Sequence, residues 1–230
     1  LTSTNYNKDE QKVVGGKNGY GAKLTNIFSK SFKLETVDSH RKKKYTQLFR
    51  GNMKIISKPK IVDYSDKPYT KITWTADFKR FGIENYSEDM IYLMMRRVYD
   101  IAGITDKSVS VYLNNKNLSI KSFSDYSKMY LNDETLIYDE FIDNNIPWKI
   151  GVSISDTDSF EQVSFVNGIC TSKGGKHVDL ISKLLTTSLK KNLSKKEYQY
   201  IKKLKLSFCL ANNFLDVQTN RSGEERILIG

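Results

Sequence analysis

Apolar residues recur along the chain at the spacings of short strands and amphipathic helices. Leu24, Ile27 and Phe28 have helical spacing and predict a helix over residues 22–29. Alternation of polar and apolar residues predicts strands over residues 32–37, 44–49, 71–76, 109–113, 162–167 and 204–210, and residues 114–117 are expected to form a turn and a return strand after the fourth of these. In the third of these strands Ile72 and Trp74 share one face, which predicts that the strand is half-buried.

Two longer helices follow from the same periodicity. Ser87 is a suitable N-cap for the first, because Glu88 and Asp89 then complement the helix dipole in its first turn. Gly103 is expected to end this helix. Its apolar stripe comprises Ile91, Met94, Met95 and Val98. The second helix starts near His177, and its apolar stripe comprises Val178, Ile181, Leu184, Leu185 and Leu189.

Strands and helices mix without a strict βαβ rhythm, so the predicted fold class is α+β. We expect a domain boundary near Lys121, which gives one domain over residues 1–121 and a second over residues 122–230. No apolar run approaches the ~18 residues of a membrane helix, so we expect no integral membrane protein. The first residue is Leu1, and we expect that the chain was cut from a longer one.

Composition adds a partner class. The 230 residues include 37 Lys and Arg against 26 Asp and Glu, a formal net charge of +11. This excess predicts a polyanionic partner, namely nucleic acid, an anionic membrane surface or a nucleotide phosphate, although a solvated lysine surface explains it equally well. The two cysteines, Cys170 and Cys209, exclude a disulfide scaffold and a cysteine-rich zinc module, and we expect both thiols to be buried.

The most informative segment is the glycine-rich run GGKNGYGAK at residues 15–23, which leads into the first predicted helix. Its glycines allow close approach of a ligand to the backbone, and the N-terminus of the helix favours anions. Lys17 and Lys23 add mobile positive charge. The spacing differs from that of a Walker A loop, and no strand precedes the run as in a dinucleotide fingerprint. The alternative is a flexible surface loop.

Four blocks in order resemble the ATPase region of eukaryotic-type type IIA DNA topoisomerases. The blocks are LTSTNY (1–6) with VGGKNGYGAKLTNIFS (14–29), then MRRVYDIAG (95–103), then SFVNGI (164–169) with TSKGGKHVD (171–179), and finally QT (218–219). The resemblance implies part of a GHKL-type α/β sandwich, followed by a transducer domain similar to domain 2 of ribosomal protein S5. It disfavours a GHKL kinase or chaperone, in which the transducer blocks would have no counterpart.

The resemblance also implies a nucleotide site built from three segments. Ser3, Thr4 and Asn5 would contact the sugar and phosphates of ATP. A lid would place backbone amides on the β- and γ-phosphates, and its residues are Gly16, Lys17, Asn18, Gly19, Tyr20, Gly21, Ala22 and Lys23. Gln218 and Thr219 would reach the γ-phosphate from the transducer. Asn220 stands where the family has a phosphate-sensing lysine, so a charge-assisted contact would be lost there.

Further expectations rest on the resemblance alone. They are ATP and Mg²⁺ as cofactors, double-stranded DNA as partner, a homodimer and a nuclear location. The family's general-base glutamate, its magnesium-holding asparagine and its adenine-reading aspartate would all precede Leu1, so we expect the chain alone neither to hydrolyse ATP nor to relax DNA. Residues 221–230 show no family resemblance, which suggests a truncated gene model, intron read-through or a pseudogene.

Other candidate residues are fewer. Lys190 and Lys191 match a region where the family's transducer carries lysines that face DNA, and are the predicted DNA-binding pair. The run 41–44 is as compatible with a solvated surface as with DNA binding. His40 and His177 lack metal-ligand spacing, and we expect a structural role for His177 at a helix start. Gly174 and Gly175 are expected to form a turn. The rival to a topoisomerase part is a non-catalytic, basic nucleic-acid-binding remnant.

Overall fold

A computed structural model describes residues 16, 18–143, 146–155, 159–197, 206–212 and 226–229, and for the last two ranges it describes the backbone alone. The chain divides into two compact units, of which one contains Gly16–Glu88 and the other Asp89–Gly230. The boundary near Lys121 is predicted between two domains of the family, whereas the division seen in the structure is between two compact units. The Lys121 boundary therefore stays a prediction.

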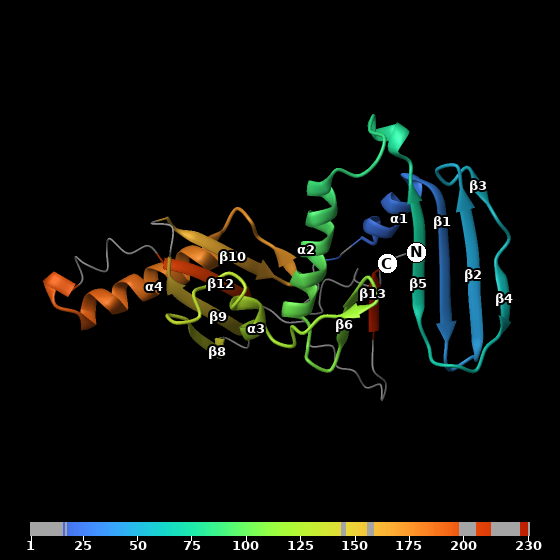
Figure 1. Cartoon of the computed structure of the whole chain (residues 1–230). Helices are drawn as coiled ribbons and strands as arrows, with labels where there is room; N and C mark the ends of the chain where they lie inside the picture. Colours follow the sequence, from blue (N-terminus) through green and yellow to red (C-terminus); the bar gives the residue numbers. More distant parts are fainter. Residues whose placement is uncertain are drawn as a thin grey trace. The chain divides into compact units, whose positions relative to one another are not determined.

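The first unit is a helix on an antiparallel sheet (Figure 1). Its elements are α1 (Tyr20–Ile27), β1 (Ser29–Asp38), β2 (Lys43–Arg50), β3 (Ile55–Ile56), β4 (Lys60–Asp63), β5 (Thr70–Ala76) and the 3-10 helix η1 (Phe78–Phe81). The strand order is β3-β2-β1-β5, and β4 also pairs with β2. Phe32 is fully buried, and its ring meets that of Phe49 edge to face at 6.1 Å. This pair is the apolar centre of the unit.

The predicted elements of this unit are confirmed with shifted ends. The helix starts two residues earlier than expected, at Tyr20, and ends at Ile27 because Ser29 already belongs to β1. The strands at 32–37, 44–49 and 71–76 lie within β1, β2 and β5. The predicted half-burial of β5 is wrong. Ile72 and Trp74 share a face, as expected, but remain 39% and 44% exposed, and the residues on the other face of β5 are exposed as well.

The described residues of the second unit form two sheets and three helices (Figure 1). Its helices are α2 (Glu88–Ile104), α3 (Phe123–Ser127) and α4 (Lys176–Asn192). Its strands are β6 (Ser110–Leu113), β7 (Lys116–Asn117), β8 (Ile137–Asp143), β9 (Ile146–Ile154), β10 (Glu161–Val166), β11 (Ile169–Cys170), β12 (Leu206–Asn212) and β13 (Arg226–Ile229). The strand orders are β11-β10-β12-β9-β8 and β13-β6-β7.

The larger sheet has a helix on each face. Trp148 and Ile150 of β9 pack against Val178 and Ile181 of α4. Gly151, whose neighbours on β9 point to α4, instead faces Ser127 of α3. Since side chains alternate along a strand, α3 and α4 must cover opposite faces of this sheet.

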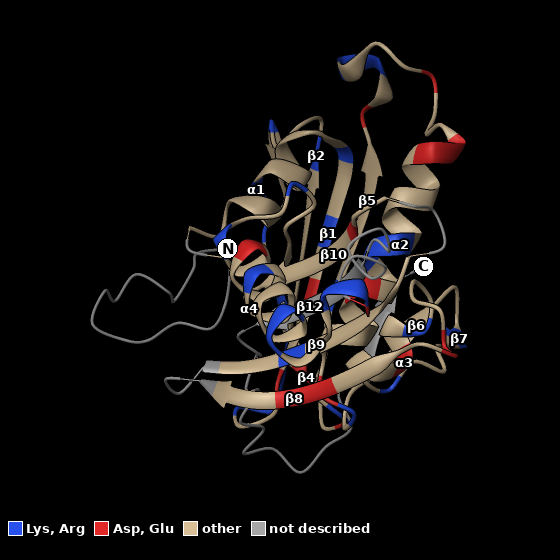
Figure 2. Ribbon diagram, turned by 90° about the vertical axis from the view of Figure 1, so that its left-hand side faces the viewer, with Lys and Arg blue, Asp and Glu red and all other residues tan. Residues whose placement is uncertain are grey.

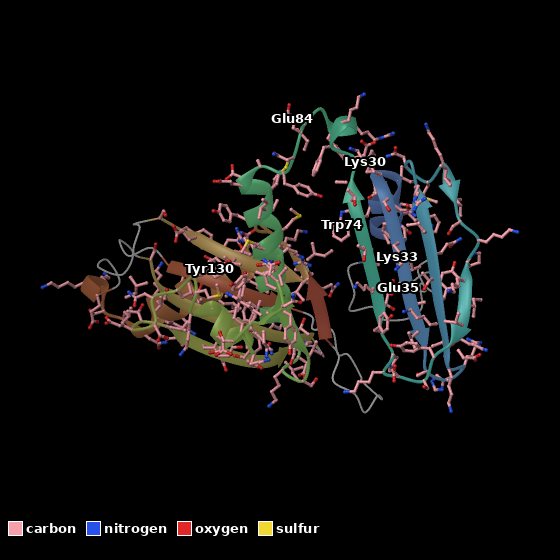
Figure 3. All side chains as sticks on the ribbon, turned by 45° about the vertical axis from the view of Figure 1, so that its right-hand side comes forward. Lys30, Lys33, Glu35, Trp74, Glu84 and Tyr130 are labelled. Atoms are coloured by element: carbon pink, nitrogen blue, oxygen red, sulfur yellow. The ribbon has the colours of Figure 1, made fainter. Side chains whose placement is uncertain are left out.

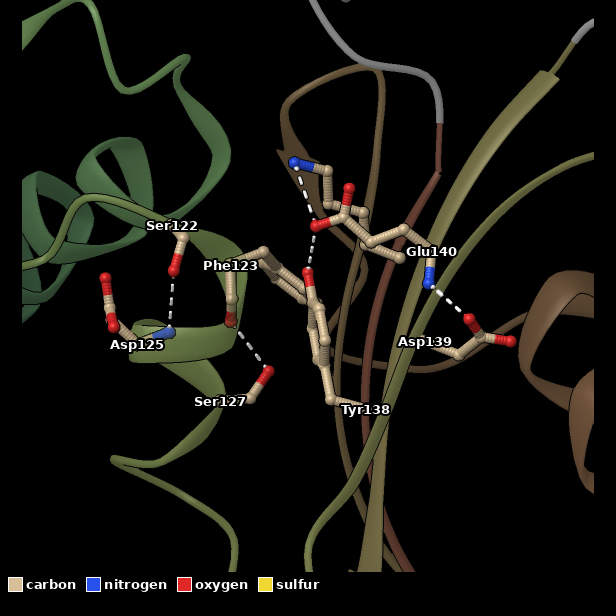
Figure 4. Close-up of polar contacts among 8 residues, drawn as sticks. Ser122, Phe123, Asp125, Ser127, Tyr138, Asp139 and Glu140 are labelled. Carbon is tan, nitrogen blue, oxygen red and sulfur yellow. Dashed lines mark hydrogen bonds and ion pairs between the residues drawn. The ribbon is translucent and has the colours of Figure 1, made fainter.

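Polar contacts stabilise α3 and β8 (Figure 4). The Ser122 hydroxyl caps α3 by accepting a hydrogen bond from the Asp125 amide at 3.1 Å. On β8 the Tyr138 hydroxyl donates to Glu140 at 2.5 Å, and Lys149 of β9 lies 3.5 Å from the same carboxylate. Burial, supported by this bond, raises the pKa of Tyr138, so its hydroxyl stays a donor.

In the smaller sheet, β6 and β7 form a tight hairpin, and α2 packs against it. Asn114 and Asn115 both have positive φ, 49° and 64°, the conformation of a two-residue hairpin turn. This confirms the strand, turn and return strand expected at 109–117. Val98 and Ala102 of α2 pack against Val111 in the core of this region. Residues 221–230 contribute β13, which pairs in parallel with β6.

One expectation for the second unit fails. Gly103 does not end α2, which continues to Ile104; its lack of a side chain instead makes room for Tyr126. The elements α3, β8 and β9 were not expected at all. The strand at 162–167 and the helix near His177 are confirmed as β10 and α4. The strand at 204–210 is confirmed for Leu206–Asn212, while Leu204 lies outside the described residues.

Candidate nucleotide-phosphate site

The glycine-rich run ends at the N-terminus of α1. Gly19 is the N-cap and has φ 65° and ψ 23°, the left-handed conformation that glycine adopts without steric cost. No described side chain caps this end of the helix. The amides of the first turn, from Tyr20 onward, have no acceptor within the helix and carry its positive dipole end. An anion is the complement of such an end.

The space around the loop suits a close ligand. A Cβ added at Gly16 or Gly21 would meet no atom within 4 Å. Tyr20 is 61% exposed, and the ammonium of Lys23 lies 6.0 Å from the centre of its ring. Lys23 therefore adds a mobile positive charge one turn into the helix. These residues fit the phosphates of a nucleotide through backbone donors and one cation.

A cavity of about 970 Å³ lies between α1 and the sheet. From the helix it is lined by Lys23, Asn26 and Ile27. The sheet contributes a mainly apolar wall that includes Leu34 and Phe49. Asn26 is 2% exposed, and its Oδ1 has no hydrogen-bond partner among the described residues. Sequence reasoning missed this residue, although a polar side chain between Leu24 and Ile27 was a visible signal.

Charge at the rim of the cavity is mixed. Asp38 accepts hydrogen bonds from the backbone amide and the guanidinium of Arg41, and these lower the pKa of its carboxyl. Lys43, also at the cavity, pairs with Asp63 at 2.6 Å. Lys23 is the cation of the cavity wall for which no such acidic partner is present among the described residues.

The other predicted nucleotide contacts fall on residues outside the described part of the chain. Ser3, Thr4, Asn5, Lys17, Gln218, Thr219 and Asn220 lie outside the described residues. Of the predicted nucleotide site, the structure therefore describes Gly16 and the six residues from Asn18 to Lys23. Their roles, and the closing of the 218–220 segment over the same ligand, stay predictions.

The second glycine pair forms the expected turn into a helix. The Gly174 amide donates to the Thr171 carbonyl at 2.8 Å, and Gly175 is the N-cap of α4. Nε2 of His177 lies 3.0 Å from the Thr171 hydroxyl and 3.3 Å from the Ser164 hydroxyl, and these two hydroxyls are themselves in close contact. Burial lowers the pKa of His177, while Asp179 opposes the shift. His177 thus links the first turn of α4 to Ser164 of β10, which agrees with the structural role expected for it at a helix start.

The predicted DNA-binding lysines are accessible. Lys190 and Lys191 occupy the last turn of α4, where cations complement the helix dipole, and both are exposed. Cys170 is half-buried, and burial raises the pKa of its thiol; the side chain of Cys209 lies outside the described residues.

The described residues offer neither a metal site nor a membrane span. They contain no group of three or more His, Cys, Asp and Glu side chains that could hold a metal ion. The Mg²⁺ expected from the family therefore has no such ligand set among the described residues. No helix in the described ranges has the length and apolar character needed to cross a membrane.

Comparison with known proteins agrees with this architecture. A family model described as DNA gyrase B matches residues 109–208. DNA topoisomerase 2 of Saccharomyces cerevisiae is 41% identical over 233 residues, which cover 93% of this chain and 16% of that protein. The chain thus spans about a sixth of the length of this curated relative.

Solved structures match over nearly the whole chain. The ATPase region of Saccharomyces cerevisiae topoisomerase II superposes with a TM-score of 0.77 at 41% identity, covering 92% of this chain and 55% of that one. The ATPase and transducer domains of DNA topoisomerase II from Balamuthia mandrillaris give 0.75 at 34% identity, covering 94% and 56%. The fold is accordingly α+β, with part of a GHKL-type ATPase domain followed by a transducer domain.

Fold and sequence together define the class as type IIA DNA topoisomerase. Within that class the chain belongs to the eukaryotic-type DNA topoisomerase II family, of which it matches a part.

Proposed function

We propose that this chain serves ATP-dependent passage of one DNA duplex through another, by binding the phosphates of ATP and coupling the nucleotide state to a DNA gate. The lid from Gly16 to Lys23 holds the β- and γ-phosphates, and Gln218, Thr219 and Asn220 close over the γ-phosphate. One observation carries the proposal. Gly19, in the left-handed conformation, is the N-cap of α1. The backbone amides of the first turn and the side chain of Lys23 therefore lie near the same end of the helix, where Gly16 and Gly21 leave open space.

The chemistry of this end is electrostatic. A helix N-terminus carries about half an elementary positive charge, and each favourable anion contact is worth about 0.3–1 kcal/mol at an exposed site. Lys23 strengthens the attraction, and Gly16 and Gly21 leave room for phosphate oxygens at the backbone. ATP rather than a lone phosphate is proposed because the relatives include the ATPase region of topoisomerase II.

The second unit supplies the coupling. In the proposed scheme ATP joins two copies of the chain as a homodimer in the nucleus, and the transducer reports the nucleotide state to the DNA-cleaving domains by a rigid-body shift. Lys190 and Lys191 contact the DNA backbone from the exposed end of α4. Mg²⁺, if it takes part, would offset the negative charge of the phosphates and would be held by residues other than the described ones, which contain no suitable ligand group.

The chain by itself is proposed to be inactive. Water activation needs a general base and a metal, and neither is expected in this part of the family sequence. Asn220 also offers a neutral amide where an ammonium would stabilise charge in the transition state. Purified chain should therefore neither hydrolyse ATP nor relax supercoiled DNA, and measurable turnover would refute this point.

Limited trypsin digestion tests nucleotide binding. Cleavage after Lys17 and Lys23 should slow when a non-hydrolysable ATP analogue is added, while cleavage after Lys42, in the exposed turn between β1 and β2, should not change. ADP should protect less, since it lacks the γ-phosphate. Equal protection at all three lysines, or none at any, would favour the rival proposal of a non-catalytic basic nucleic-acid-binding remnant.

A further inference from the structure

The sheet of the first unit has a second face, opposite the one that packs on Phe32 and Phe49. The strand registers place mainly polar residues on it from four strands. We call it the basic face, and its residues are Ser31, Lys33, Glu35 and Val37 of β1, Lys44, Thr46, Leu48 and Arg50 of β2, Lys60 and Val62 of β4, and Lys71, Thr73 and Thr75 of β5. Glu35 is the one acid among them.

Glu35 is already occupied by cations of its own surface. Lys33 forms a close ion pair with it (Figure 3), and Lys44 lies 3.4 Å from its other oxygen. Lys44 is also held by the rings of Tyr64 and Tyr69, each 5.4 Å from its ammonium. The hydrogen bond from Lys33 holds the pKa of Glu35 below its usual value. The acid is therefore neutralised locally and does not cancel the charge of the rest of the face.

The remaining cations of the basic face are open to solvent. Arg50, Lys60 and Lys71 are exposed, and none has an acidic partner among the described residues. Figure 2 shows basic segments on β1 and β2 within this sheet. The exposed residues Thr73 and Thr75 follow Lys71 on the same face of the edge strand β5. Cations and hydroxyls on a flat surface are the usual donors to phosphate oxygens.

The spacing of the outer lysines suits a duplex. Lys60 lies opposite Thr46, Thr46 opposite Glu35, and Glu35 opposite Lys71. Three steps between neighbouring strands separate the two lysines by about 14 Å. The major groove of B-DNA is about 12 Å wide, so flexible lysine side chains at this separation can reach phosphates on both of its edges.

We propose that the basic face binds the sugar-phosphate backbone of double-stranded DNA without regard to base sequence. Duplex DNA is preferred over single strands because the aromatic rings described beside this face, Tyr64 and Tyr69, are engaged with Lys44 and each other and so do not offer a platform on which bases could stack. The surface lies on a different unit from Lys190 and Lys191 and does not depend on nucleotide binding.

Salt-dependent binding of a short fluorescent duplex of mixed sequence, measured with the whole chain, tests the proposal. The variant Lys60→Gln/Lys71→Gln should reduce the log-log salt slope by about 1.8 and the affinity by up to about 60-fold at 0.1 M salt, since each phosphate contact contributes about 0.9 to the slope. The matched control Lys107→Gln/Lys116→Gln removes two exposed lysines of the second unit and should change neither.

A gain-of-affinity variant guards against loss through misfolding. Glu35→Gln removes the acid and frees Lys33 and Lys44, so DNA should bind more tightly and with a steeper salt slope. Equal affinity in the Lys60/Lys71 variant and its control would overturn the proposal, as would tighter binding of poly-glutamate than of DNA. A loss seen with Lys190→Gln/Lys191→Gln alone would support the proposed function and contradict this inference.

Discussion

Gly103 and Tyr126 touch so closely that α2 has no room for a side chain at this position. A Cβ added to Gly103 would lie 2.5 Å from Cγ of Tyr126 and 2.6 Å from its Cβ. Both distances are shorter than any ordinary contact, and the ring is fully buried. The glycine is therefore retained in the last turn of α2 for helix packing, not for ending the helix.

Gly103→Ala should destabilise the second unit by about 2 kcal/mol, because overpacking outweighs the better helix propensity of alanine. The fluorescence of Trp148, buried at 7% exposure against α4, reports on this unit in a Trp74→Phe background during urea unfolding. Gly21→Ala is the control, since open space surrounds that position. An unchanged midpoint for Gly103→Ala would contradict the packing account.

Tyr126→Phe should also destabilise the second unit, by about 1–3 kcal/mol. The Tyr126 hydroxyl donates to Asp100 at 2.7 Å, and Asp100 is only 4% exposed. The variant would leave a buried carboxylate whose nearest cation, Arg97, is 3.9 Å away. The same urea measurement applies, and Tyr92→Phe, at a side chain 61% exposed, should have no effect. Similar midpoints for both variants would rule out this buried hydrogen bond as a source of stability.

Acid should weaken the second unit through His177. Its pKa is lowered in the folded state, chiefly by burial, so the unfolded chain binds a proton more readily. The contribution to stability is complete above the unfolded value of 6.5 and is lost as the pH falls below it. Urea unfolding from about pH 8 to about pH 5 should show this slope. It should disappear in His177→Gln and persist in His40→Gln; a slope unchanged in His177→Gln would assign it to another group.

Gly19→Ala should weaken nucleotide binding about fivefold. An alanine in the left-handed conformation costs about 1–2 kcal/mol, so the loop would relax away from the geometry that aims the α1 amides. Gly82→Ala is a matched control, because Gly82 has φ 67° at the end of η1 and the same intrinsic strain. Calorimetric titration with a non-hydrolysable ATP analogue measures both variants. Equal losses would show that general strain, and not the loop, is responsible.

Local patterns predicted the elements that depend on local interactions. Alternation located β1, β2 and β5, and the consecutive Asn114 and Asn115 marked the hairpin turn because both residues tolerate positive φ. The glycine-rich run correctly indicated a loop before a helix, since its residues remove side chains just where α1 begins.

Elements that depend on distant contacts were not predictable in this way. The helix α3 has five residues, too few for a periodic signal, and Tyr126 is buried only because α2 and β10 meet it. On β8, Asp139 and Glu140 obscure the alternation, and Pro147 hides the start of β9. The basic face likewise requires the register of four strands, which sequence spacing does not supply.

Amide chemical shifts of the labelled chain, titrated with a non-hydrolysable ATP analogue, test the central claim most directly. Resonances of Tyr20, Gly21 and Ala22 should shift saturably, while those of His177 and Val178 should not, although α4 also begins at a glycine without a side-chain cap. Equal shifts at the two helices, or no shift at α1 at saturating analogue, would contradict the assignment of the α1 N-terminus as a nucleotide-phosphate site.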